Sequence, residues 1–263
     1  MKQGLTSPMR YLMDDVPEGG KTVTVAPGVK WLRMPLPLAL DHINLYLLAN
    51  GDGWMVVDCG MKGGITRQLW QQVFETELEG KPINAVLSTH MHPDHIGQAG
   101  WLVGHWNVPF YMTASEYFTA RAYTAPAQDI PEEWQHDTYA VRTGMPREYV
   151  EKMRKGTAGF GSIVEPLPRS FKRLQDGQIL TLGDQRWQVI IGRGHSPEHA
   201  CLYNAALNIL ISGDQVLPQI TSNVSVNSTE PDANPLQEWM QSLQRMLELP
   251  DDVLVCPAHN APF

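Results

Sequence analysis

Cysteine is scarce in the 263-residue sequence, and long apolar segments are missing. The three cysteines, Cys59, Cys201 and Cys256, are widely spaced in apolar stretches, which argues against a disulfide framework and predicts buried free thiols. The N-terminal stretch lacks an apolar core of signal-peptide length, and no window approaches the roughly 20 apolar residues of a membrane span. We therefore expect a cytoplasmic protein with no membrane partner.

Basic residues are also in short supply. The chain has 20 Lys and Arg residues against 28 Asp and Glu residues, a formal net charge of −8, and no Lys/Arg block stands out. Because nucleic-acid binders depend on a basic footprint to hold phosphates, we expect no nucleic-acid partner. A small-molecule substrate is expected instead.

Several common signatures are absent as well. We find no Ser/His/Asp triad, no internal repeat and no low-complexity tract, and the stretch GMKGG lacks the lysine pattern of a phosphate-binding loop. Hydrophobic residues make up 43% of the chain, which is typical of a globular protein. We therefore expect a single domain over residues 1–263.

The order of apolar runs and turn signals predicts an α/β protein. Strands are expected within 21–34, 44–49, 54–60, 85–89 and 108–113, with a hairpin turn at 50–53. They resume within 178–184, 186–192, 199–205, 207–214 and 253–259. Helices are expected within 63–80, where Ile65, Leu69 and Val73 have helical spacing, and within 234–249. This order indicates two sheets with helices outside.

Residues 114–170 have a different texture, with helical pieces, Pro and Gly breaks and many aromatic residues. We interpret them as a helical insertion between two strand-rich halves. The insertion could be a lid over a site, or its aromatic residues could simply form its own core.

A cluster of metal-ligand residues follows the strand expected at 85–89. His90 and His92 lie two apart at a strand end, so both side chains can point the same way, and Asp94 and His95 open the next helix. A catalytic zinc ion usually takes about three protein ligands and keeps one position open for water. Four such residues in this arrangement therefore suit two metal ions better than one.

The missing ligands should come from other strand ends. His195, Asp214 and His259 each follow an apolar run, in the way that His90 does. We expect these three residues to join the cluster. The other histidines singled out are expected to be structural, although His199 could contact the ligands; they are His42, His105, His136 and His199.

This pattern, His-x-His-x-Asp-His followed by a His, an Asp and a His on later strand ends, resembles the metallo-β-lactamase superfamily. The resemblance runs from about residue 25 to residue 263, apart from the 114–170 insertion. It implies a four-layer αβ/βα sandwich with the site at one edge of the two sheets. It also implies that Asp58 contacts the site without binding metal.

The resemblance assigns ligands to two divalent metal ions. The first ion would be held by His90, His92 and His195. The second would be held by Asp94, His95 and His259, with Asp214 bridging both ions. Zinc is the expected metal, with iron and manganese as alternatives.

Two positions depart from the family pattern. The turn usually written His-Thr-Pro-Gly-His reads His195-Ser196-Pro197-Glu198-His199 here, so a carboxylate replaces a glycine near the first metal. The glycine that usually follows the last histidine is Asn260. Glu198 could be catalytic or merely solvated. Ser222, Asn223 and Ser225, in the loop after Asp214, could reach the substrate or simply belong to a solvated loop.

The implied mechanism is that of a dinuclear hydrolase. A bound zinc ion lowers the pKa of water from 15.7 to about 7, so a hydroxide that bridges the two metals could attack a thioester or ester carbonyl of a small substrate. Asp94 is the predicted catalytic residue, because it would orient the nucleophile or relay its proton.

The bridging carboxylate separates branches of the superfamily. True β-lactamases generally lack it, so Asp214 favours a thioesterase of the glyoxalase-II (hydroxyacylglutathione hydrolase) kind. The alternatives are a lactonase and a phosphodiesterase or nuclease. A β-lactamase and a di-iron redox protein are less favoured.

Overall fold

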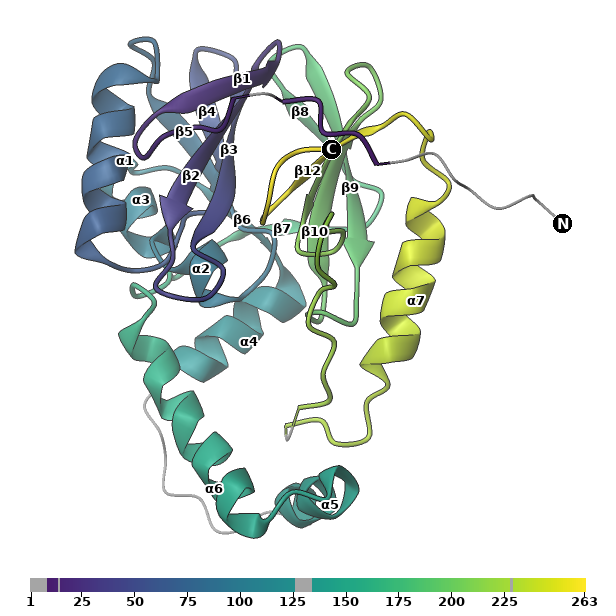
Figure 1. Ribbon diagram of the computed structural model, residues 1–263. Coiled ribbons are helices and arrows are strands. Elements are labelled where there is room, and N and C mark those ends of the chain that lie inside the picture. The colour runs from purple at the N-terminus through teal and green to yellow at the C-terminus, as the bar shows by residue number, and fades with distance from the viewer. Residues whose placement is uncertain (1–8, 14, 126–133, 228) are drawn as a thin grey trace, which may run out of the picture.

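Two β-sheets face each other, with helices on their outer sides (Figure 1). This computed structural model describes residues 9–13, 15–125, 134–227 and 229–263. The arrangement confirms the α/β sandwich that the sequence predicts. None of the described helices is long and apolar enough to cross a membrane.

The first sheet has seven strands in chain order. They are β1 (Thr22–Ala26), β2 (Val29–Pro35), β3 (His42–Asn50), β4 (Gly53–Val57), β5 (Ile83–Leu87), β6 (Phe110–Thr113) and β7 (Lys172–Leu174). The strands from β1 to β4 pair antiparallel, and those from β4 to β7 pair parallel. The predicted hairpin between β3 and β4 is confirmed, whereas the short β7 was not predicted.

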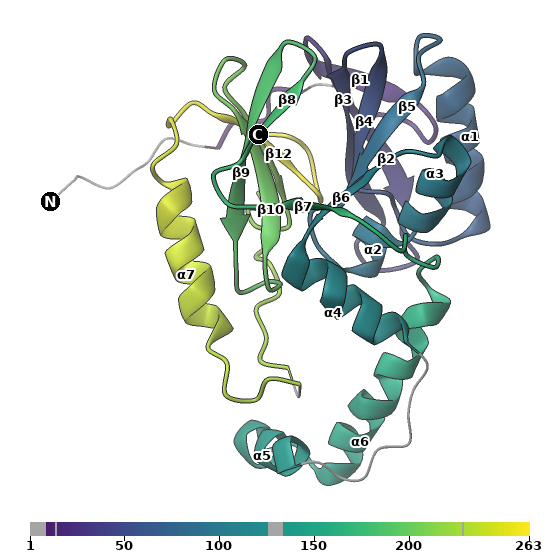
Figure 2. The same cartoon turned by 180° about the vertical axis from the view of Figure 1, so that it is seen from behind.

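The second sheet has five strands in the order β12-β11-β10-β9-β8. Their bounds are β8 (Ile179–Leu182), β9 (Gln185–Gly192), β10 (His199–Asn204), β11 (Ile209–Gly213) and β12 (Leu254–Pro257). β11 and β12 are parallel, and the other pairs are antiparallel. Helix α7 (Pro235–Met246) covers the outer face of this sheet (Figure 2).

Helices α1 (Gly64–Thr76) and α3 (Ala99–Trp106) cover the outer face of the first sheet, and the short α2 (Pro93–Ile96) lies between them in the chain. The helix predicted within 63–80 is confirmed by α1, although Ile65, one of the residues with helical spacing, is 65% exposed. Trp70 and Val73 are fully buried, and the Trp70 indole donates a hydrogen bond to the Cys59 carbonyl at 2.8 Å. Burial of this large side chain turns Ile65 towards the surface.

Alternating side chains divide the core into three layers. Trp31 points between the sheets, whereas Leu32 of the same strand packs under the outer helices. Each layer contains one cysteine: Cys59 lies with α1 and α3, Cys256 between the sheets, and Cys201 with the residues under α7. All three thiols are buried and free, as the sequence predicts.

Residues 114–162 contribute helices α4 (Ala114–Thr124), α5 (Trp134–Thr143), α6 (Arg147–Gly156) and the 3-10 helix η1 (Thr157–Ser162). They lie outside the sandwich, with α4 beside the sheets and α5 and α6 beyond it (Figures 1 and 2). Arg142 of α5 contacts the loop before α7 through Asp232 at 2.6 Å and the Pro231 carbonyl at 2.6 Å. This contact joins α5 to the loop before α7.

Candidate metal centre

Both sheets bring polar side chains to one edge, where strands end. The residues that follow β4, β5, β9, β11 and β12 carry these side chains, and they include Asp58, His90, His195, Asp214 and His259. An apolar strand positions each of them rigidly, because its own side chains are fixed in the core. The predicted convergence of strand ends is therefore visible in the geometry.

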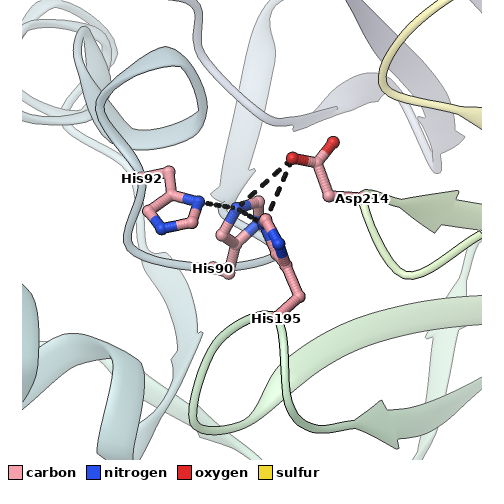
Figure 3. A group of neighbouring side chains, drawn as sticks. All are labelled: His90, His92, His195 and Asp214. Carbon is pink, nitrogen blue, oxygen red and sulfur yellow. Dashed lines mark hydrogen bonds and ion pairs between the residues drawn. The ribbon is translucent and has the colours of Figure 1, made fainter. Parts of the chain in front are cut away.

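One group of donors contains three imidazoles and a carboxylate (Figure 3). His90 Nε2 lies 2.9 Å from His92 Nδ1 and 3.2 Å from His195 Nε2. Asp214 Oδ2 lies 3.2 Å from His195 Nε2. The four donor atoms are within 4.8 Å of one another, so a single cation could contact all of them.

The second group contains Asp94, His95 and His259. Asp94 Oδ2 lies 3.6 Å from Nε2 of both histidines. Asp214 stands between the groups, with Oδ2 3.7 Å from His95 Nε2 and Oδ1 3.4 Å from His259 Nε2. The structure thus brings together all seven residues that the sequence singled out.

The donors fit divalent metal ions. His95 Nε2 and Asp214 Oδ1 are buried and have no hydrogen-bond partner among the described residues. Buried polar atoms are nearly always paired, so these two atoms indicate a ligand between them. Imidazole nitrogens with carboxylate oxygens are the donor set of zinc, iron and manganese sites.

The electrostatics agree with this fit. Burial lowers the pKa of His90 well below its ordinary value and that of His92 to about 3, so both rings are neutral and can donate a lone pair to a metal. Burial also opposes charge on His95, but Asp58, Asp94 and Asp214 outweigh it and raise the His95 pKa well above its ordinary value. The site therefore stabilises positive charge beside Asp214.

Asp58 and Thr89 position two of the metal-donor histidines through hydrogen bonds. Asp58 Oδ2 accepts a hydrogen bond from His95 Nδ1 at 2.8 Å, and Oδ1 accepts one from the Thr89 amide at 2.8 Å. Asp58 thus makes the contact that the resemblance implied, and it turns Nε2 of His95 towards the centre. Thr89, whose hydroxyl also lies 3.1 Å from His90 Nδ1, was not singled out in the sequence.

His42 and Asn260 support His259, the last of the predicted ligands. The His42 carbonyl lies 3.0 Å from His259 Nδ1, and His42 Nε2 accepts the Asn260 amide at 3.1 Å. Asn260 has a φ of 66°, in the left-handed region that Gly adopts freely and Asn tolerates better than most residues. That conformation explains why Asn can stand where the family pattern has Gly, and His42 has a role beyond packing.

His199 contacts two of the predicted ligand residues, His90 and Asp214. Its ring stacks on His90 with centroids 4.7 Å apart, and its Nε2 accepts the Asp214 amide at 3.0 Å. A Cβ on Gly213 would lie 2.5 Å from this ring, so the residue before Asp214 must be glycine. His105 packs only against aromatic rings in the described contacts, and the His136 side chain lies outside the described residues.

A cavity of about 550 Å³ opens beside the first donor group and is lined by His92 and His195. Tyr123 of α4 and Phe160 of η1 form an apolar wall, with ring centroids 5.6 Å apart.

Ser225, in the loop after Asp214, also lines the cavity, whereas Asn223 of the same loop offers its carbonyl to His195 Nδ1 at 2.8 Å. Ser222 is buried and its hydroxyl bonds the Asp214 carbonyl. The loop after Asp214 thus both supports the site and borders the cavity.

Fold and site together define an α/β sandwich with a candidate metal centre at the edge of its sheets. The chain belongs to the metallo-β-lactamase superfamily, whose family model matches residues 38–259. Membership makes it a hydrolase that works with divalent metal ions.

Individual relatives extend over most of the chain. A crystal structure of a β-lactamase domain protein from Burkholderia ambifaria is 41% identical, with a TM-score of 0.84 over 96% of this chain and 75% of that one. The acyl-coenzyme A thioesterase MBLAC2 of Homo sapiens is 25% identical over 91% of this chain and 81% of its own length. An uncharacterised protein of Aquifex aeolicus is 28% identical, and the match covers 66% of each chain.

Proposed function

We propose that the protein is a dinuclear metal-dependent hydrolase that cleaves thioesters or esters of small substrates. The observation that carries the proposal is the position of Asp214. Its two oxygens lie 3.2 Å from His195 Nε2 of one donor group and 3.4 Å from His259 Nε2 of the other. A carboxylate in that position suits two ions that act on one substrate.

The ligand assignment follows the two donor groups. His90, His92 and His195 would hold one ion, Asp94, His95 and His259 the other, with Asp214 between them. When bound, such ions lower the pKa of a coordinated water to about 7 and polarise an acyl oxygen. We propose zinc, because nitrogen-rich sites of this kind suit it, with iron or manganese as alternatives.

Asp94 is the proposed catalytic residue. Its side chain is 19% exposed, more than that of Asp214 at 10%, so it can face a substrate while Oδ2 stays among the donors. There it can orient the attacking water and accept or release its proton. The neighbouring His95 and His259 hold the carboxylate oxygen from two sides.

The acyl substrate is favoured by two observations. The cavity beside His195 has an apolar wall at Tyr123 and Phe160, which suits the acyl part of a substrate. MBLAC2, which matches 91% of this chain, is named as an acyl-coenzyme A thioesterase. We further propose that residues 114–170 act as a helical insertion that covers this cavity, in the manner of a lid.

The test compares a thioester and an oxyester of one acyl group with a lactone and a phosphodiester. Protein stripped with a chelator and reloaded with two equivalents of zinc is assayed on a thioester, an oxyester, a lactone and an unrelated phosphodiester. We expect the thioester or oxyester to be cleaved fastest, and we expect chelation to abolish the activity. Cleavage of the phosphodiester alone would place the chain in another branch, and activity that survives chelation would remove the metal from the mechanism.

A further inference from the structure

Glu116 is a fully buried carboxylate that lies outside both donor groups. It belongs to the first turn of α4. Its Oε2 accepts the Met91 amide at 2.9 Å, and its Oε1 accepts the Glu198 amide at 2.7 Å. A buried carboxylate is costly unless its oxygens accept hydrogen bonds, and here both oxygens do.

The two amides belong to the two loops that supply the first donor group. Met91 lies between His90 and His92, and Glu198 lies three residues after His195 in the turn that ends at β10. A single carboxylate therefore ties together the backbones that carry all three imidazoles of that group. If this tie lengthened, the distance between His195 and the other two rings would change.

The second donor group has different supports. Its His259 is held by His42, and its His95 is held by Asp58. Neither contact passes through Glu116. The two groups therefore differ in their dependence on α4.

Glu198 strengthens the same junction. Its side-chain Oε2 accepts the Ser115 amide at 3.1 Å, and its carbonyl accepts the Thr113 hydroxyl at 2.9 Å. Ser115 lines the cavity beside the first donor group. The Glu at this position, where the family pattern has Gly, therefore binds the start of α4 to the turn of His195.

We propose that Glu116 is a positioning residue that sets the spacing of the two ligand loops and so controls the affinity of the first metal site. It acts through backbone amides and does not touch the metal or the substrate. The inference rests on the proposed dinuclear centre, but it concerns metal binding and can be tested without a substrate.

The decisive variant is Glu116→Gln, which keeps the shape of the side chain and replaces one accepting oxygen with an NH2 group. Metal-free protein is titrated with Co²⁺ against a competing chelator, and the two sites are resolved by the absorption bands of bound Co²⁺. We expect the affinity of the first metal site to fall about 10- to 100-fold, as for other supports of metal ligands. The affinity of the second site should change less than about threefold. Glu116→Asp keeps the charge on a shorter chain and should recover part of the loss.

The matched control is Glu77→Gln. Glu77 also joins two distant segments with one carboxylate, accepting the Thr22 amide at 3.1 Å and the Thr22 hydroxyl at 2.7 Å, but it lies at the end of α1. Both variants should lose some thermal stability. Only the Glu116 variants should change the Co²⁺ spectrum and the affinity.

Three results would overturn the proposal. The first is a Glu116→Gln protein that binds two Co²⁺ ions as the parent does, and the second is an equal loss at both sites. The third is failure of both Glu116 variants to fold without metal, because the carboxylate would then support the whole fold. A parent that binds two ions but hydrolyses no ester would contradict the proposed function and leave this inference standing.

Discussion

The strand-end edge and the helical segment, that is, the described helices within residues 114–162, are built differently, although α4 and η1 line the same cavity as the edge. At the edge, His90, His95 and Asp214 are buried, and each is held by further contacts. On the helical segment, Val141 is 81% exposed and Tyr149 is 53% exposed. The comparison shows that the strand-end residues are held in a packed environment, whereas α5 and α6 carry large apolar side chains on their surface.

The largest effect on metal binding and activity should come from a change at Asp214, which lies between the two donor groups. Asp214→Asn removes the charge that lies between the two donor groups, so both ions should be held more weakly. We expect kcat/KM to fall by more than about 100-fold, since even outer supports of metal ligands contribute 10- to 100-fold. Metal content after dialysis and kcat/KM are measured beside Asp52→Asn in the β3–β4 turn. An Asp214→Asn protein that retains both metals would contradict the bridging role.

A smaller effect at the edge is expected for Asp58→Asn. Asn tolerates the positive φ of 63° at this position, so the backbone should be undisturbed. The variant weakens the hydrogen bond that orients His95, and we expect metal affinity to fall about 10- to 100-fold with less loss of kcat in metal-saturated protein. Unchanged affinity in a chelator competition would show that His95 is oriented by other contacts.

The helical segment should behave differently. Arg142→Ala breaks the contact with Asp232, an ion pair whose two side chains are 54% and 64% exposed. Exposed pairs contribute about 0–1 kcal/mol, so we expect KM to change less than about fivefold, with metal affinity unaltered. Arg186→Ala, on the exposed side of β9, is the control. If Arg142→Ala released metal instead, the division between edge and segment would be wrong.

The smallest effect concerns Glu77, outside both regions. Burial raises the pKa of its carboxyl, but hydrogen bonds from Thr22, Thr76 and Lys21 outweigh burial and lower it to about 2. The unfolded value is roughly 4.3, so the stabilisation is complete above that pH and is lost as the pH falls towards 2. Urea unfolding of metal-free protein at pH 7 and pH 3 should show a smaller acid loss in Glu77→Gln than in the parent.

The edge could be predicted from the sequence because its signals are local. Four of the predicted ligand residues follow an apolar run, and the end of a strand is visible in a few neighbouring positions; these residues are His90, His195, Asp214 and His259. The same holds for the hairpin between β3 and β4, whose turn residues are contiguous. Family resemblance added the grouping of the ligands and the place of Asp58.

Other features depend on partners that are distant in the chain. Glu116 accepts amides that are 25 and 82 residues away, and a backbone amide leaves no mark in the sequence. The orientation of α1 depends on where Trp70 finds space, which the spacing of Ile65 and Leu69 does not reveal. Strand β7 has only three residues, too few for an alternating pattern.

Because each layer of the core contains one cysteine, the reactivity of each thiol reports the local unfolding of its own layer. Burial raises the pKa of all three thiols, that of Cys256 to about 12, so none forms the reactive thiolate while its layer is closed. Alkylation at Cys59, Cys201 and Cys256 therefore requires local exposure, and the three labelling rates give the order in which the helix-covered faces and the inter-sheet seam come apart.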